Sequence, residues 1–76
     1  MPKINGRIPE GGAGAFVQLR DAEGDFVGEV RADEQGEFTF YAVPGDWHVI
    51  CLMPGGRRLE RDVSIEFGDV VIKVPA

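Results

Sequence analysis

Turn signals recur along the chain at near-regular intervals, and this spacing constrains the fold more than any other feature. Clusters rich in Gly, Pro and Asp occur at residues 9–14, 21–25, 33–36, 44–46, 54–56 and 67–69. Gly accepts positive φ, Pro fixes φ, and an Asp side chain bonds to the backbone two residues further on. Short segments separated by regular turns are typical of a β-sandwich or a small barrel.

The segments between the turns alternate apolar and polar residues with a period of two. Faces expected to be buried carry Ala15, Val17 and Leu19; Phe38 and Phe40; Trp47, Val49, Cys51 and Met53; Leu59, Val63, Ile65 and Phe67; and Val70, Ile72 and Val74. Such alternation places one side of a strand in the core. No helical period is present. The sequence predicts a single all-β sandwich domain over 1–76, with about seven strands near 3–8, 15–20, 26–32, 37–42, 46–53, 58–65 and 69–74.

A short internal echo predicts two similar hairpin turns. The segments 21–26 and 33–38 share the pattern D-x-x-G-x-F. In each, the Asp is expected to bond to the backbone and the Gly to take the left-handed conformation. The Phe that follows is expected to enter the core.

Charge and composition exclude several classes of partner. The 76 residues include 13 acids and 8 bases, for a formal net charge of −5. Nucleic acid and anionic membranes are therefore not expected partners, because both require a basic surface. The one basic cluster, Arg57, Arg58 and Arg61, is expected to be a solvated strand end. The single cysteine allows no internal disulfide, and no signal peptide or membrane-length apolar run is evident, so we expect a cytoplasmic protein.

Four stretches carry a resemblance to a known group of domains. They are Ile4-x-Gly6-x-Ile8, Gly14-Ala15-Phe16-Val17-Gln18-Leu19, Ala32-Asp33-x-x-Gly36-x-Phe38-x-Phe40 and Pro44-Gly45-x-Trp47-x-Val49. In this order they resemble the carboxypeptidase regulatory-like group, over residues 4 to about 53. The resemblance implies a Greek-key β-sandwich of the transthyretin-like (prealbumin-like) kind.

Within that group, segments 14–19 and 36–47 look most similar to a bacterial domain family of unknown function. Its members are often encoded beside thiosulfate sulfurtransferases (rhodanese-type enzymes), so the resemblance implies such an enzyme as a partner by association alone. Transthyretin-like enzymes that hydrolyse hydroxyisourate use several histidines and a C-terminal Tyr-Arg-Gly-Ser. This chain has one His and ends Val74-Pro75-Ala76, so that activity is not carried over.

Catalytic and metal sites find little support in the sequence. The chain has one His, one Cys and one Ser, and the odd spacing of His48 and Cys51 places them on opposite faces of a strand. We expect Cys51 to be a buried structural thiol, no catalytic residue and no cofactor. The acids around Gly24 lack the further ligands of a calcium loop, so no metal is expected. One enzyme-like alternative is a sulfur carrier, which would need Cys51 as an exposed thiolate of low pKa.

Several large side chains are expected on outward faces. By the parity of the alternation Phe16, Tyr41, Ile50 and Leu52 point to solvent, together with His48. A cluster of such residues marks an interface, although a bulge or a covered edge strand would bury them instead. We predict a non-catalytic interaction module that forms a homodimer or docks on a partner protein such as a sulfurtransferase, through the sheet bearing Phe16, Tyr41, His48, Ile50 and Leu52. The alternative is a small-ligand or carbohydrate-binding domain with Trp47, Tyr41 and His48 as contacts.

Overall fold

Seven strands and no helix make up the computed structural model, which describes residues 1–9 and 12–74. The strands are β1 (Lys3–Arg7), β2 (Phe16–Arg20), β3 (Phe26–Arg31), β4 (Glu37–Tyr41), β5 (Gly45–Leu52), β6 (Arg58–Ile65) and β7 (Val70–Lys73). The predicted all-β class and the seven strands are confirmed. The turn expected at 9–14 and the predicted single domain of 1–76 extend partly outside the described residues.

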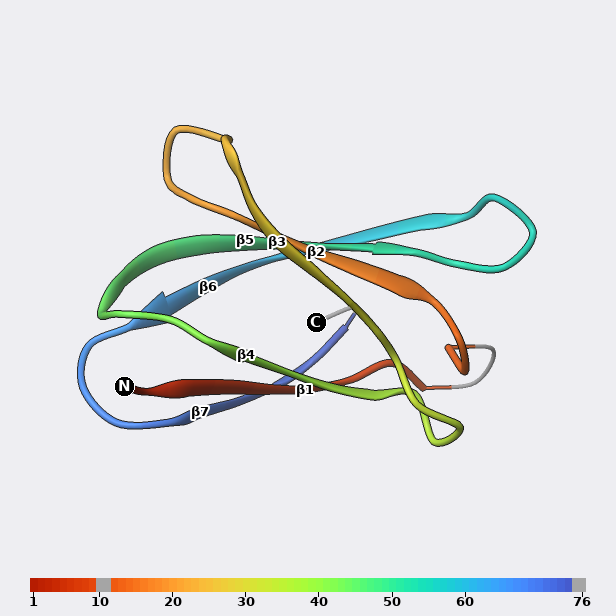
Figure 1. Ribbon diagram of the computed structural model, residues 1–76, viewed down its shortest axis with the longest axis horizontal. Coiled ribbons are helices and arrows are strands. Elements are labelled where there is room, and N and C mark those ends of the chain that lie inside the picture. The colour runs from red at the N-terminus through yellow and green to blue at the C-terminus, as the bar shows by residue number, and fades with distance from the viewer. Residues whose placement is uncertain (10–11, 75–76) are drawn as a thin grey trace.

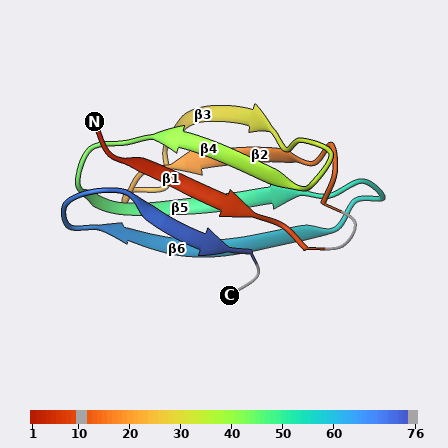
Figure 2. The same ribbon diagram turned by 90° about the horizontal axis from the view of Figure 1, so that it is seen from below.

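The strands form two sheets that lie face to face (Figures 1 and 2). One sheet has three strands in the order β4-β1-β7, and the other has four in the order β3-β2-β5-β6. All neighbouring strands are antiparallel except β1 and β7, which are parallel. Within the described part of the chain, no helix is long and apolar enough to cross a membrane.

The core lies between the two sheets and is built from the inward positions of the alternating strands. Its most deeply buried side chains are Ile4, Ile8, Val17, Leu19, Val49, Cys51, Ile65 and Val74. Trp47, expected inward, is partly buried and packs against this core. The prediction for Phe67 is wrong, because β6 ends at Ile65 and leaves Phe67 in the following turn, 86% exposed.

A glycine in β1 makes room for a large aromatic residue of β4. Gly6 and Phe38 lie opposite each other in the antiparallel register, and a Cβ atom on Gly6 would overlap the Phe38 ring. Phe38 therefore covers the position where Gly6 has no side chain, and its ring meets that of Phe40 edge-on, with centroids 5.9 Å apart. The Ile4-x-Gly6-x-Ile8 pattern thus follows from packing between two neighbouring strands.

The two D-x-x-G-x-F turns have the same hydrogen bonds. Oδ1 of Asp21 accepts from the amides of residues 23 and 25, and Oδ1 of Asp33 from those of residues 35 and 37, at 2.9–3.0 Å. Gly24 and Gly36 have positive φ values of 86° and 78°. Both turns are therefore confirmed.

The aromatic residues that end these two motifs differ. Phe38 is buried as expected, but the prediction that Phe26 enters the core is wrong, because it is 55% exposed. Phe26 begins the edge strand β3, and the β2–β3 register shifts between Leu19 and Arg20, next to its partner position. The Arg20 guanidinium lies 5.8 Å from the centre of the Phe26 ring.

The basic cluster is only partly a solvated strand end. Arg61 lies on β6 with its side chain half-buried, and its guanidinium donates a 2.7 Å hydrogen bond to the carbonyl of Lys73 on β7. This bond joins the two sheets along the edge formed by β6 and β7. Arg57 and Arg58 are exposed, and Arg58 forms an ion pair with Glu60.

Candidate functional site

The outer face of the four-stranded sheet holds most of the residues predicted to form an interface. The strand register arranges its side chains in three rows that cross the sheet. The first row is Arg31, Phe16, Leu52 and Arg58; the second is Glu29, Gln18, Ile50 and Glu60; the third is Phe26, Arg20, His48 and Asp62. We call these the arginine row, the glutamate row and the histidine row.

An exposed apolar pair lies at the centre of the arginine row. Phe16 on β2 and Leu52 on β5 are register partners and are 48% and 37% exposed. The Arg31 guanidinium lies 5.4 Å from the centre of the Phe16 ring, within the range of a cation–π contact. Its Nε donates a 3.2 Å hydrogen bond to the carbonyl of Gly14. The Phe16 ring is thus held on the surface and remains accessible from outside.

Ile50 is a correction to the predicted interface. The alternation places it on the outer face, yet it is only 3% exposed. Its cross-strand neighbours are Gln18 and Glu60, and its neighbours along β5 on the same side are His48 and Leu52. Long side chains on a flat sheet can cover the residue between them, so Ile50 lies beneath this surface and does not project from it.

Tyr41 is a second correction, because it does not share a sheet with the other four residues. It ends β4 in the three-stranded sheet, where it pairs with Lys3 of β1. Its side chain is 65% exposed, and the Lys3 ammonium lies 6.0 Å from the ring centre. The outward direction of Tyr41 was predicted, but parity within a strand does not say to which sheet that strand belongs.

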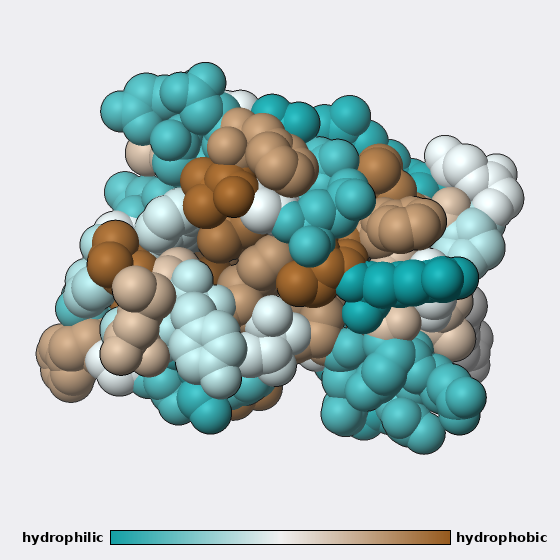
Figure 3. All heavy atoms as spheres, in the orientation of Figure 1, coloured by the Kyte–Doolittle hydropathy of each residue, from teal (hydrophilic) through white to brown (hydrophobic). Residues whose placement is uncertain are grey.

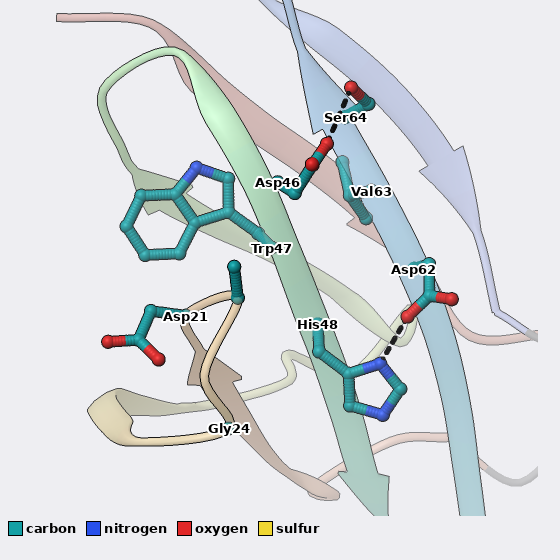
Figure 4. Close-up of a pocket in the computed structure, with 9 residues that line it drawn as sticks. Asp21, Gly24, Asp46, Trp47, His48, Asp62, Val63 and Ser64 are labelled. Carbon is teal, nitrogen blue, oxygen red and sulfur yellow. Dashed lines mark hydrogen bonds and ion pairs between the residues drawn. The ribbon is translucent and has the colours of Figure 1, made fainter.

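His48 is held between two carboxylates of the neighbouring strand β6. Its Nδ1 lies 2.5 Å from Asp62 Oδ1, and its Nε2 lies 2.7 Å from Glu60 Oε1 (Figure 4 shows the first of these contacts). Hydrogen bonds to Glu60 and then to Asp62 raise the pKa of His48 above its usual value. A carboxylate at each nitrogen stabilises the imidazolium relative to the neutral ring, and both nitrogens are engaged in hydrogen bonds.

Glu60 links His48 to Arg58. Its Oε1 contacts His48, and its Oε2 accepts a 2.7 Å bond from Nε of Arg58. The His48 hydrogen bond, with a smaller contribution from Arg58, lowers the pKa of Glu60. The resulting chain of four charged groups along the surface was missed by the sequence reasoning, since it depends on the β5–β6 register.

A groove of about 550 Å³ lies beside His48 at the end of the four-stranded sheet that carries the β2–β3 turn. Its walls include Asp21, Asp46, Trp47, His48 and Asp62. Figure 4 shows Trp47 beside the turn formed by Asp21 and Gly24, whereas His48 points toward β6. The indole N–H of Trp47 donates a 2.9 Å bond to the Val43 carbonyl. The groove therefore combines a fixed aromatic ring with carboxylates, and Tyr41 is not one of its lining residues.

Cys51 lies in the core, fully buried, on the opposite side of β5 from His48. Burial raises the pKa of its thiol to about 11. A sulfur carrier needs an accessible thiolate, and Cys51 in this fold is neither accessible nor ionised at neutral pH.

The acidic turn around Gly24 uses its Asp side chain for structure. Asp21 accepts two backbone amides, as described above, which leaves this carboxylate engaged within the turn. Among residues 1–9 and 12–74 no group of three or more His, Cys, Asp or Glu side chains is arranged to hold a metal ion.

The exposure of three further apolar side chains was missed by the sequence reasoning. Phe26 and Val27 of β3 and Val43 after β4 are all at least half exposed. Edge strands β3 and β4 lie toward the viewer in Figure 1, and Figure 3 shows apolar side chains gathered between polar margins on this side. Their exposure depends on β3 and β4 being edge strands of different sheets. A local sequence pattern does not reveal which strands pair.

Comparison with known proteins places the chain in a family. Residues 3–74 match the family described as "Protein of unknown function (DUF1416)". An uncharacterized protein of Mycolicibacterium smegmatis is 42% identical over 57 residues, which is 70% of this chain and 63% of the relative. Two uncharacterized proteins of Mycobacterium tuberculosis H37Rv are each 40% identical over 57 residues, or 57% of their length. The matched segment thus spans about three fifths of these relatives, and the chain belongs to the DUF1416 family of proteins of unknown function.

Proposed function

We propose that this chain is a non-catalytic protein-interaction module that binds its partner through the outer face of the four-stranded sheet. The observation that carries the proposal is the exposed pair Phe16 and Leu52, which are cross-strand partners at the centre of the arginine row. Aromatic and aliphatic side chains grouped on a polar surface mark protein interfaces. The arginines at both ends of this row supply the polar rim that such interfaces carry.

The charge balance of this face also supports docking. The chain has a net charge of −5, but the three rows contain three arginines and three carboxylates, together with His48. Alternating charges on a surface favour a complementary partner and disfavour others. This face therefore does not carry the acidic excess of the rest of the chain.

The non-catalytic part of the proposal rests on His48 and Cys51. Both nitrogens of His48 are engaged by carboxylates, and Cys51 is a buried thiol of raised pKa. A nucleophilic mechanism needs a base with a free nitrogen or an ionised nucleophile within reach. Neither residue has those properties in this fold.

We also propose that the two sheets form a Greek-key sandwich of the transthyretin-like kind. In support, spatial neighbours are often distant in sequence: β1 lies between β4 and β7, and β2 lies beside β5. Such neighbours are typical of Greek-key sandwiches and not of simple meanders. The exposed apolar pair supports a second copy of this chain as the partner, and the resemblance described above implies a rhodanese-type sulfurtransferase as the other candidate.

The proposal is tested with the variants Phe16→Lys and Leu52→Lys. Ile50 is not a suitable target, because a charge at this buried position would damage the fold. Solution mass is measured by light scattering across a hundredfold dilution, and binding to a purified bacterial rhodanese-type sulfurtransferase is measured in parallel. We expect at least one association in the wild type, weakened tenfold or more by either variant.

The matched control is Val71→Lys, an 83% exposed residue of the three-stranded sheet. It adds the same charge to a different surface and should leave association unchanged. The proposal is overturned if the wild type associates with neither partner, or if Val71→Lys weakens association as much as Leu52→Lys does.

A second candidate function, small-ligand or carbohydrate binding, is favoured by the groove beside Trp47. The ring is half-buried and fixed by its bond to Val43, so a flat ligand could lie against it between carboxylate acceptors. Titration with neutral mono- and disaccharides should then shift the Trp47 fluorescence, and Asp46→Asn should weaken the response. No shift at millimolar sugar would remove this candidate.

A further inference from the structure

We propose that the outer face of the four-stranded sheet binds a second copy of this chain about a twofold axis that crosses the strands between the arginine row and the glutamate row. This inference rests on the proposed function and specifies its partner and its geometry. The observation behind it is that two adjacent rows on one face carry opposite charges at both ends. Arg31 and Arg58 end one row, and Glu29 and Glu60 end the next.

A twofold rotation about such an axis places each strand of one copy over the same strand of the other copy. The two strands then run in opposite directions. The arginine row of one copy then lies on the glutamate row of the other. Arg31 on β3 meets Glu29 of the second copy, and Arg58 on β6 meets its Glu60. Between these ends Leu52 lies over the Ile50 position, and Phe16 lies over Gln18. Because the contact is isologous, each pairing occurs twice.

Arg31 and Glu29 are the charges best placed to make this contact. Both are exposed, and neither takes part in an ion pair within residues 1–9 and 12–74. Glu29 accepts a 3.1 Å bond from the Gln18 amide, and Arg31 lies over the Phe16 ring. These contacts orient both side chains on the face and leave their charges available to a partner.

Other twofold arrangements of the same face place like charges together. An axis along the strands would set Arg31 against Arg58 of the second copy and Glu29 against its Glu60. An axis between the glutamate and histidine rows would set Glu60 against Asp62. Like charges across an interface disfavour association, and of these three axes only the one between the first two rows is complementary at both edges.

Sheet geometry is compatible with this contact. Sheets that pack face to face cross at about 30° because each is twisted. The central residues Leu52 and Phe16 stay in register under such a rotation, and the long Arg and Glu side chains at the edges can follow it. The buried Ile50 then lies beneath the centre of the contact.

The experiment uses two single charge reversals and their mixture. In Arg31→Glu, a Glu meets Glu29 of the second copy twice; in Glu29→Arg, an Arg meets Arg31 twice. Each variant alone should self-associate at least tenfold more weakly than the wild type. An equimolar mixture should restore association to within about threefold, because in the mixed dimer both pairs are again Arg with Glu. Association is measured by sedimentation velocity, and folding of each variant by circular dichroism and thermal unfolding.

The double variant Glu29→Arg/Arg31→Glu should also associate like the wild type, and it keeps the test decisive if one single variant folds poorly. A wild type that is monomeric at all concentrations overturns this inference, while sulfurtransferase binding sensitive to Leu52→Lys would keep the proposed function. Self-association that is weakened by Leu52→Lys but not rescued by mixing also overturns the twofold geometry and leaves the interaction face standing.

Discussion

The ring of Phe38 lies across Gly6, its partner in the β1–β4 register. The ring occupies the space that a side chain at Gly6 would need. An aromatic residue that covers a glycine of the neighbouring strand is a known way to pin strand register. The relationship places both residues under strong steric constraint.

Replacing Gly6 by Val should therefore destabilise the fold. The new side chain would overlap the Phe38 ring, which must leave its position between the sheets. Overpacking of this kind costs about 1–3 kcal/mol. The free energy of unfolding is measured by urea denaturation. Gly28→Ala on β3 is the control, because a Cβ there meets no atom within 4 Å, and it should change stability by less than about 0.5 kcal/mol. Equal losses in the two variants would contradict the packing argument.

Glycine substitutions in the two D-x-x-G-x-F turns distinguish the cost of backbone strain from the cost of steric overlap. Gly24 and Gly36 both have positive φ, but only at Gly36 would a Cβ collide, with the carbonyl oxygen of Ile8. Gly24→Ala should cost about 1–2 kcal/mol for the left-handed backbone alone. Gly36→Ala should cost at least about 1 kcal/mol more, since the chain at Ile8 must move. Comparison of the two unfolding midpoints checks this, and a larger loss at Gly24 would rule the explanation out.

His48 should titrate at a pH above its ordinary value of 6.5. Its midpoint can be followed by NMR from the imidazole protons, because it is the only His in the chain. Glu60→Gln should lower the midpoint most and Asp62→Asn should lower it less, following the order of the two contributions. A midpoint in Glu60→Gln equal to that of the wild type would show that the contact is not formed in solution.

The same cluster should make stability depend on pH in a defined window. The raised pKa of His48 means that its contribution is fully present below about 6.5 and is lost as the pH rises through the folded-state value. The lowered pKa of Glu60 means that its contribution is present above about 4.5 and is lost as the pH falls. The stability difference between the wild type and His48→Gln should therefore be largest between about pH 4.5 and 6.5. A difference that does not vary from pH 4 to 9 would contradict this coupling.

Cys51 should be inert in the native protein. Its thiol is buried and has a pKa of about 11, so a thiol reagent at pH 8 should label it only when the protein unfolds. Since this pKa lies above the ordinary value of 9.0, stability should decline as the pH rises from about 9 toward 11. Labelling in seconds without denaturant would instead revive the sulfur-carrier alternative.

The fold could be predicted largely because its signals are local. Each of the Asp21 and Asp33 turns is encoded by a motif of six consecutive residues. The alternation within each strand can likewise be recognised without knowing which strands it pairs with. The predictions that Phe67 and Phe26 are buried were wrong for a different reason. Whether a residue at the end of an alternating run reaches the core depends on where the strand stops and on what covers it.

The site was predicted less well, because it depends on pairing between strands. Phe16 and Leu52 were identified as outward residues, but their register partnership follows from the β2–β5 pairing. The same holds for the contacts of His48 with β6 and for the cover over Ile50. Tyr41 is an example: its outward direction was predicted correctly, but the sheet to which it belongs was not. Only long-range pairing decides these questions.

The parallel pairing of β1 with β7 has a consequence for how the chain must be made. Among the described strands, β1 precedes the other six and is the central strand of its sheet, yet one of its two neighbours is β7, which follows the others in sequence. The amide of Lys3 also bonds to the side chain of Asp69, 66 residues later. During translation the four-stranded sheet can form first. One side of β1 stays unpaired until residues 70–73 have left the ribosome. The smaller sheet is therefore complete only once residues 70–73 are available, and a polypeptide halted before residue 70 leaves one side of β1 unpaired.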